Sequence, residues 1–157
     1  MNVSAPLQDT LEALRRMLEE RGVRLRQPVD GAPRPIPGNA SQLEQLFLNL
    51  CLNAIEAMQS GGELTVRVAE VSEGGSSTLR VEISDTGCGI PEESLATIFD
   101  PFFTTKAHGT GLGLAICRSI ADAHHARLSA VSPAGQPGST FLIEFPVPVG
   151  GGARVTT

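Results

Sequence analysis

The spacing of hydrophobic and polar positions divides the first half of the chain into two amphipathic helices. Between residues 7 and 20 leucines recur at helical spacing with charged residues between them, and Gly22 follows as a stop signal. A second, longer helix is predicted after Asn39, which opens an N-A-S-Q sequence typical of an N-cap with a capping-box glutamine. Its hydrophobic period continues to Met58, and the Ser-Gly-Gly sequence at 60–62 is predicted to end it.

Strict alternation of hydrophobic and polar residues predicts strands in the remaining segments. Residues 64–71 and 78–85 alternate around Gly74 and Gly75, which is typical of an antiparallel pair joined by a turn. Further strands are predicted at 23–27, as an edge strand, and at 127–131 and 139–145, as a final pair. The stretch 28–38 is too rich in proline for regular structure, Pro91-Glu92-Glu93 opens a short helix, and the glycine-rich segment at 109–113 leads into another that runs through Ala123.

This order of elements predicts an α+β fold. We expect a two-layer sandwich in which a mixed, mostly antiparallel sheet is covered by helices on one face and open to solvent on the other. The length of 157 residues, with 41% hydrophobic residues, suits one domain with its own core. We expect that domain to span residues 1–148 and to be followed by a loose tail at 149–157.

Charge and cysteine content exclude several classes of function. A net charge of -5 argues against nucleic-acid binding, which needs a basic surface. The sequence has no hydrophobic run of membrane-spanning length and no signal-peptide pattern at its N-terminus, so we expect a cytoplasmic protein without direct membrane contact. The three cysteines are odd in number and lack C-x-x-C spacing, so we expect reduced, structural thiols.

Four stretches carry candidate chemistry, and each has an ordinary structural explanation as well. Asn49 and Asn53, with Glu56, share one face of the long helix, as either a solvated surface or amide ligands for Mg²⁺. Asp85, in D-T-G-C-G-I-P, is either part of a turn or a carboxylate that accepts a hydrogen bond from an exocyclic amine. The F-D-P-F-F-T-T-K stretch, residues 99–106, is either a hydrophobic corner or the anchor of a loop over an anion.

The fourth stretch is G-T-G-L-G-L-A-I, residues 109–116. Three alternating glycines before a helix fit a flexible loop, and they also fit a backbone that bends closely around a phosphate at a helix N-terminus. The pattern matches neither the dinucleotide fingerprint nor the P-loop. Spacing within this stretch therefore leaves both interpretations open.

Taken in order, the four stretches resemble the ATP-site boxes of sensor histidine kinases, within the wider ATPase family that includes gyrase, Hsp90 and MutL. The resemblance covers nearly the whole chain and implies a Bergerat-type sandwich, in which ATP lies between the asparagine helix and a lid after the phenylalanine box. The short lid is similar to that of the nitrogen-regulation and oxygen-sensing subgroup. The alternating glycines would hinge this lid.

The resemblance also implies roles for individual residues. Asn53 would coordinate Mg²⁺, Asn49 would support the metal and phosphates, and Asp85 would bind the adenine amine. Asn49 and Lys106 are the implied catalytic residues, with Lys106 contacting phosphate from the lid. The full set of implied ATP-binding positions is Asn49, Asn53, Asp85, Gly87, Gly89, Ile90, Phe99, Thr105, Lys106, Gly109, Thr110, Gly111, Leu112 and Gly113.

The chain departs from the family pattern in two places. Relatives that hydrolyse ATP carry a glutamate where Asn49 stands, and an amide cannot take a proton from water at neutral pH, so we expect slow hydrolysis. The family's A-H-G-G sequence is A-H-H-A here, at 123–126, and we expect strain at His125 without loss of the fold.

The family's reaction passes the γ-phosphoryl group of ATP to a histidine on a separate dimerisation domain. His108, His124 and His125 lack the acidic neighbour and helical context of that acceptor, so we expect it to lie outside this sequence. The resemblance thus implies a catalytic module with ATP and Mg²⁺ as cofactors, and the dimerisation domain and a response regulator as partners. Two alternatives are a nucleotide-binding regulatory module without kinase activity and an anti-sigma-factor-type serine kinase.

Overall fold

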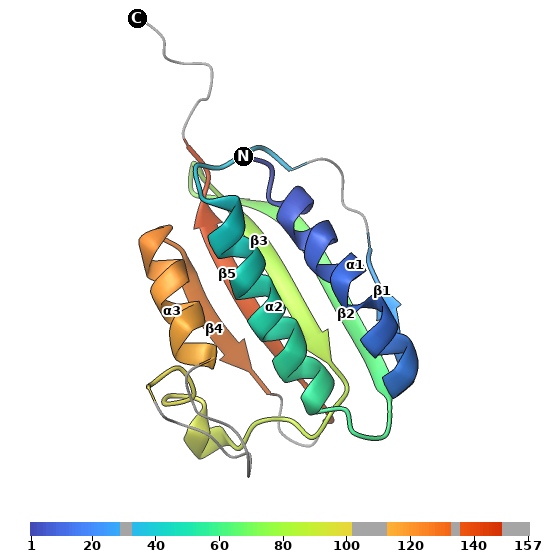
Figure 1. Cartoon of the computed structure of the whole chain (residues 1–157). Coiled ribbons are helices and arrows are strands. Elements are labelled where there is room, and N and C mark those ends of the chain that lie inside the picture. Colours follow the sequence, from blue (N-terminus) through green and yellow to red (C-terminus); the bar gives the residue numbers. More distant parts are fainter. Residues whose placement is uncertain (29–32, 102–112, 133–135, 149–157) are drawn as a thin grey trace, which may run out of the picture.

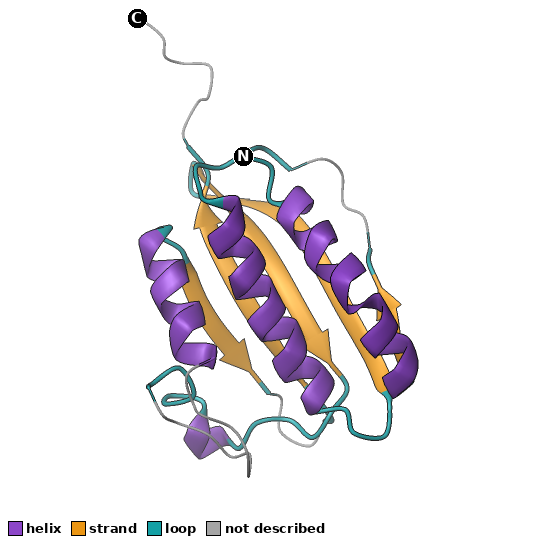
Figure 2. Ribbon diagram, in the orientation of Figure 1, coloured by secondary structure: helices purple, strands orange, loops and turns teal. Residues whose placement is uncertain are grey.

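The computed structural model describes residues 1–28, 33–101, 113–132 and 136–148, which form two layers. A five-stranded sheet with the order β1-β2-β3-β5-β4 carries three helices on one face, and its other face is open (Figures 1 and 2). β1 runs parallel to β2, and the other pairs are antiparallel. The elements are α1 (Ser4–Arg21), β1 (Val23–Arg26), α2 (Ala40–Glu56), β2 (Gly62–Glu73), β3 (Ser76–Asp85), η1 (Glu92–Ser94), α3 (Gly113–Ala123), β4 (Arg127–Val131) and β5 (Ser139–Pro146). The predicted α+β sandwich, with β1 at one edge, is therefore confirmed.

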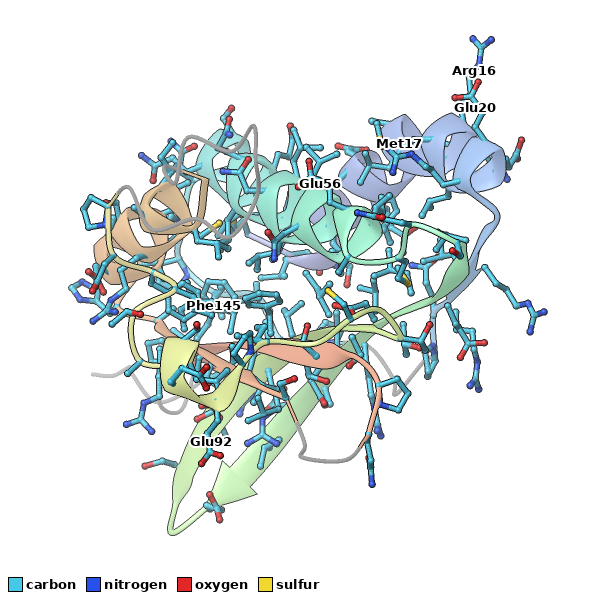
Figure 3. All side chains as sticks on the ribbon, turned by 90° about the horizontal axis from the view of Figure 1, so that it is seen from below. Arg16, Met17, Glu20, Glu56, Glu92 and Phe145 are labelled. Carbon is cyan, nitrogen blue, oxygen red and sulfur yellow. The ribbon has the colours of Figure 1, made fainter. Side chains whose placement is uncertain are left out.

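The core lies between the helices and the sheet because alternate strand residues point toward the helices. Phe145 of β5, which is 1% exposed, shows this position between the two layers (Figure 3). On the open face Arg80 of β3 forms an ion pair with Glu144 of β5 at 3.0 Å. The buried inward positions of the central strands are Leu64, Val66, Leu79, Val81, Ile83, Phe141, Ile143 and Phe145.

The cysteines are free thiols, as expected, but they differ in environment. Cys51 and Cys117 are buried between α2 and α3, and burial raises the pKa of each thiol to about 12. These two therefore stay protonated and act as small hydrophobic residues. Cys88 is exposed, and a structural role for its thiol stays a prediction. Among the described helices, none is long and hydrophobic enough to cross a membrane.

The start of α2 is set by a cap and by a contact from a distant residue. The Asn39 side chain accepts a hydrogen bond from the Gln42 N–H at 3.0 Å, which confirms the predicted N-cap. The Asn39 N–H, however, donates to His124 Nε2 at 3.0 Å, the position that Gln42 would fill in a capping box. The same imidazole contacts the Ile120 carbonyl through Nδ1 at 2.8 Å, so His124 joins the end of α3 to the start of α2.

α2 ends at Glu56, earlier than its hydrophobic period predicts. Met58 is still buried, at 1% exposure, but it enters the core from the turn that follows the helix. The Ala57 carbonyl accepts a hydrogen bond from the Cys88 N–H at 3.1 Å. A segment from beyond β3 thus takes the acceptor at the helix end, which local sequence does not reveal.

α3 ends in the strained turn that the A-H-H-A sequence predicts. Among the described residues His125 is the one non-glycine with positive φ, at 57°. The His125 N–H donates to the Asp122 carbonyl and the Ala126 N–H to the Ala121 carbonyl, at 3.0 and 2.8 Å. These two bonds form a Schellman motif, so His125 occupies a position that favours glycine.

Candidate nucleotide-binding site

The residues singled out in the sequence gather along one edge of the sandwich. In Figure 1 this is the lower edge, where β3 ends, α2 ends and α3 begins. The segment after β3 runs along the same edge toward η1 (Figure 1). Because β5 is antiparallel to β3, its first residue lies here too, with Ser139 opposite Asp85.

Asp85 is a buried carboxylate, 6% exposed, at the end of β3. Its Oδ1 accepts a hydrogen bond from the Gly87 N–H at 2.9 Å, and its Oδ2 accepts one from the Ser139 hydroxyl at 2.8 Å. Burial raises the pKa of Asp85 above its ordinary value, and the bonds from Gly87 and Ser139 oppose this shift. Each oxygen has a second lone pair, so the carboxylate can accept a further donor such as an adenine amine.

The glycines after Asp85 allow close approach of three backbone segments. A Cβ on Gly87 would overlap the Ala57 carbonyl group and lie 2.6 Å from its carbon. Gly89 has φ +79°, and a Cβ there would lie 2.9 Å from the Ser132 hydroxyl. Gly138, with φ +93°, packs its backbone against the Asp85 carbonyl group. These contacts place residues 86–90, called the glycine segment below, between the end of α2 and the start of β5.

The two asparagines lie on the C-terminal half of α2, one turn apart. Both are half-buried, whereas Glu56, labelled in Figure 3, is exposed. The Asn49 Nδ2 donates to the Gly113 carbonyl at 3.4 Å, and the Asn49 Oδ1 accepts from Gln45 Nε2 at 3.2 Å. Asn49 therefore connects α2 to the first residue of α3, where the glycine-rich stretch ends.

Two hydrophobic residues of the predicted set lie near this edge. Phe99 is 8% exposed and packs edge-on against Phe141, with ring centroids 6.1 Å apart. Ile90 is half-buried, and its N–H donates to the Ser132 hydroxyl at 2.9 Å. Phe99 thus belongs to a hydrophobic corner under the segment, which is the structural role that the sequence left open.

The lid residues lie outside the described part of the chain. They comprise the remaining phenylalanine-box and glycine-box positions, Phe102, Phe103, Thr104, Thr105, Lys106, His108, Gly109, Thr110, Gly111 and Leu112. Gly113, the last of the predicted glycines, is described and begins α3.

Three hydroxyl residues near Asp85 were missed by sequence reasoning. Ser139 donates to the carboxylate, Ser132 bridges two loops, and the Thr86 hydroxyl accepts from the Glu63 N–H at 3.0 Å. Ser139 follows a glycine at the start of a strand, a weak signal that becomes meaningful once β3 and β5 are paired.

Within the described ranges no three His, Cys, Asp or Glu residues form a metal-binding cluster. A metal held here would depend on amide oxygens and on ligand phosphates.

The fold and this edge together define the class of protein: an ATP-binding catalytic domain. Residues 38–149 match the family of histidine kinase-, DNA gyrase B- and HSP90-like ATPases. The chain belongs to this family, as the ATP-binding catalytic domain of a sensor histidine kinase in two-component signalling.

Relatives and solved structures agree on this assignment. The chain is 36% identical over 149 residues to the sensor histidine kinase TmoS of Ectopseudomonas mendocina, covering 94% of this chain and 15% of TmoS. It is 33% identical over 147 residues to the sensor histidine kinase ZraS of Escherichia coli, covering 94% of this chain and 30% of ZraS. The chain therefore spans less than a third of the length of either relative.

The histidine kinase ThkA supplies the structural comparison. Its catalytic domain matches with a TM-score of 0.81 and 28% identity, covering 93% of both chains. ThkA has also been solved in complex with the response regulator protein TrrA. The matching chain of that complex has a TM-score of 0.78 and 25% identity, over 94% of this chain and 41% of that one.

Proposed function

We propose that the chain binds Mg-ATP along the edge formed by α2, Asp85 and the glycine segment, and transfers the γ-phosphoryl group to a histidine on a separate dimerisation domain. The observation that carries the proposal is the Asp85 carboxylate. It is buried at a strand end, beside backbone that only glycine allows to approach so closely. Such an acceptor fits the amine of an adenine base.

The phosphate end of ATP is proposed to lie beside α2. Asn53 and Asn49 carry neutral amide oxygens, which are hard ligands suited to Mg²⁺. When bound, Mg²⁺ would neutralise phosphate charge. Asn53 would hold the metal and Asn49 would support it, while Lys106 and Thr105, outside the described residues, would reach the phosphates from the lid.

The acceptor of the phosphoryl group is proposed to lie outside this sequence. His124 is engaged at both ring nitrogens, with Asn39 and Ile120, and His125 occupies a helix-ending turn. These are structural roles. The proposal includes a response regulator as the next partner, by analogy with ThkA, and membership of the nitrogen-regulation and oxygen-sensing subgroup, which the likeness to ZraS supports. Because its substrate would be ATP, we place the domain in the cytoplasm.

Calorimetric titration of Mg-ATP tests the binding site. Asp85→Asn replaces a charged acceptor whose hydrogen bond contributes about 1.5–3 kcal/mol, so the Kd should rise roughly 10- to 100-fold. The exposed Asp9→Asn on α1 is the matched control, and it should leave the Kd unchanged. Equal affinities of the Asp85→Asn variant and the parent would remove Asp85 from the site.

Phosphotransfer requires a separate experiment with labelled ATP and a helical dimerisation domain that carries the acceptor histidine. The expected product is phosphohistidine, which is lost in acid and stable in base. An acid-stable product would favour the serine kinase. Tight ATP binding without any labelled product would favour the regulatory module.

A further inference from the structure

Ser132 lies at the junction of three segments near the proposed adenine site. It follows the last residue of β4 and is half-buried. Its hydroxyl accepts a hydrogen bond from the Ile90 N–H and donates one to the Gly138 carbonyl, both at 2.9 Å. A serine hydroxyl has one donor and two acceptor positions, so both bonds form at once with good geometry.

Both partners of Ser132 lie on segments that donate hydrogen bonds to the Asp85 carboxylate. Ile90 is the last residue of the glycine segment that begins after Asp85. Within this segment the Gly87 N–H donates a hydrogen bond to the Asp85 carboxylate. Gly138 precedes Ser139, the hydroxyl donor to the other carboxylate oxygen. The Ser132 side chain thus holds together the two segments that donate hydrogen bonds to the Asp85 carboxylate.

The segments at this junction approach one another closely, because two glycines lie where a side chain would overlap a neighbour. A Cβ on Gly89 would lie 2.9 Å from the Ser132 oxygen, and one on Gly138 would lie 2.9 Å from the Asp85 carbonyl carbon. Both glycines also have positive φ. The segments are therefore packed backbone to backbone, and the bonds of Ser132 fix their separation.

The geometry points to Ser132 as a positioning residue of the adenine pocket, one that sets the distance between the glycine segment and β5 without touching the nucleotide. This inference rests on the proposed placement of adenine at Asp85. Removing the hydroxyl leaves the Ile90 N–H without its partner and lets the segment move away from β5. The base end of any adenine nucleotide would be held less well, and its phosphate end would be unaffected.

The test is titration of ATP and ADP, each with Mg²⁺, against Ser132→Ala, with Ser129→Ala in the same hairpin as control. We expect the Kd of both nucleotides to rise about 5- to 10-fold in Ser132→Ala, with the ratio of the two Kd values unchanged. A merely structural role would lower the Tm and leave both Kd values alone. That result, or an equal loss in Ser129→Ala, would overturn the inference.

Two further measurements keep the test decisive. If Ser132→Ala does not fold, Ser132→Cys keeps the size of the side chain but bonds weakly, and parent-like affinity in that variant would overturn the inference. Amide exchange at Ile90 should be faster in either variant than in the parent, and unchanged exchange would contradict the bond. Asp85→Asn separates the two proposals: weaker binding in Asp85→Asn but not in Ser132→Ala rejects this inference alone, whereas no change in Asp85→Asn rejects the adenine site itself.

Discussion

Substitution of Gly87 by alanine tests the close contact between the glycine segment and α2. A Cβ at this position would lie 2.6 Å from the Ala57 carbonyl carbon and 2.9 Å from the Ala57 Cβ, whereas ordinary contact begins at 3.4 Å. The obstacle is backbone, so it cannot be relieved by a side-chain rotation. The segment would have to move away by roughly 1 Å to restore normal van der Waals distances.

The expected cost follows from the contacts that such a movement disturbs. Overpacking costs about 1–3 kcal/mol, and loss of the Cys88 N–H bond to the Ala57 carbonyl adds about 1 kcal/mol. The smaller conformational entropy of alanine in the unfolded chain returns about 0.4–1 kcal/mol. We therefore expect a net loss of about 2 kcal/mol, which for a domain of this size lowers the Tm by roughly 4–8 °C. Because the segment carries the donor to Asp85, ATP affinity should also fall.

Calorimetry and urea unfolding measure this loss, and Gly113→Ala provides a matched stability control. A Cβ on Gly113 meets nothing within 4 Å, so the same substitution at the start of α3 should be neutral or stabilising by up to about 1 kcal/mol. If Gly87→Ala is as stable as the parent, the close approach of the glycine segment to α2 does not exist as described, and the reasoning is refuted.

Three other outcomes are expected. Asn49→Glu supplies a base for water, so basal ATP hydrolysis should rise at least tenfold, and an unchanged rate of phosphate release would contradict the reason given for slow hydrolysis. His125→Gly relieves a left-handed non-glycine residue and should raise the unfolding free energy by about 0.5–1 kcal/mol in urea, while no gain would mean that the turn is unstrained. Burial raises the pKa of Asp85 in the folded protein above its ordinary value of 3.8, so the fold favours the protonated carboxyl. The contribution of Asp85 to the free energy of unfolding is therefore fully present below pH 3.8 and is lost as the pH rises through the raised pKa. Over the same window ATP affinity should increase with pH, because the carboxylate is the better acceptor, and Asp85→Asn should abolish this dependence.

Periodicity and capping signals in the sequence predicted the fold well because those signals are local. Asn39 caps α2, Gly22 ends α1 with φ +69°, and the alternating segments form the expected strands. The errors arose where a distant residue takes a local role. His124, 85 positions away, takes the place of the capping-box glutamine, and Cys88 takes the carbonyl at the end of α2.

The candidate site was predictable to a similar extent. Asp85 and Gly87 stand out because a strand pattern breaks there into small residues, and both lie where the edge of the sheet meets α2. Ser132 and Ser139 carry no comparable signal, since their importance depends on the antiparallel pairing of β3 with β5 and on the turn beyond β4. The roles of all these residues in ATP binding, like those of Thr105, Lys106 and the glycines before Gly113, stay predictions.

The first helix has a practical consequence for anyone who prepares this domain. The family match begins at residue 38, yet α1 contributes Leu7, Leu11, Leu14 and Leu18 to the common interior, each at most 4% exposed. A recombinant fragment trimmed to the family boundary would expose the hydrophobic side of α2 against which this helix packs. Such a fragment should aggregate during purification, so expression boundaries are better drawn from the packing of the fold than from the extent of sequence similarity.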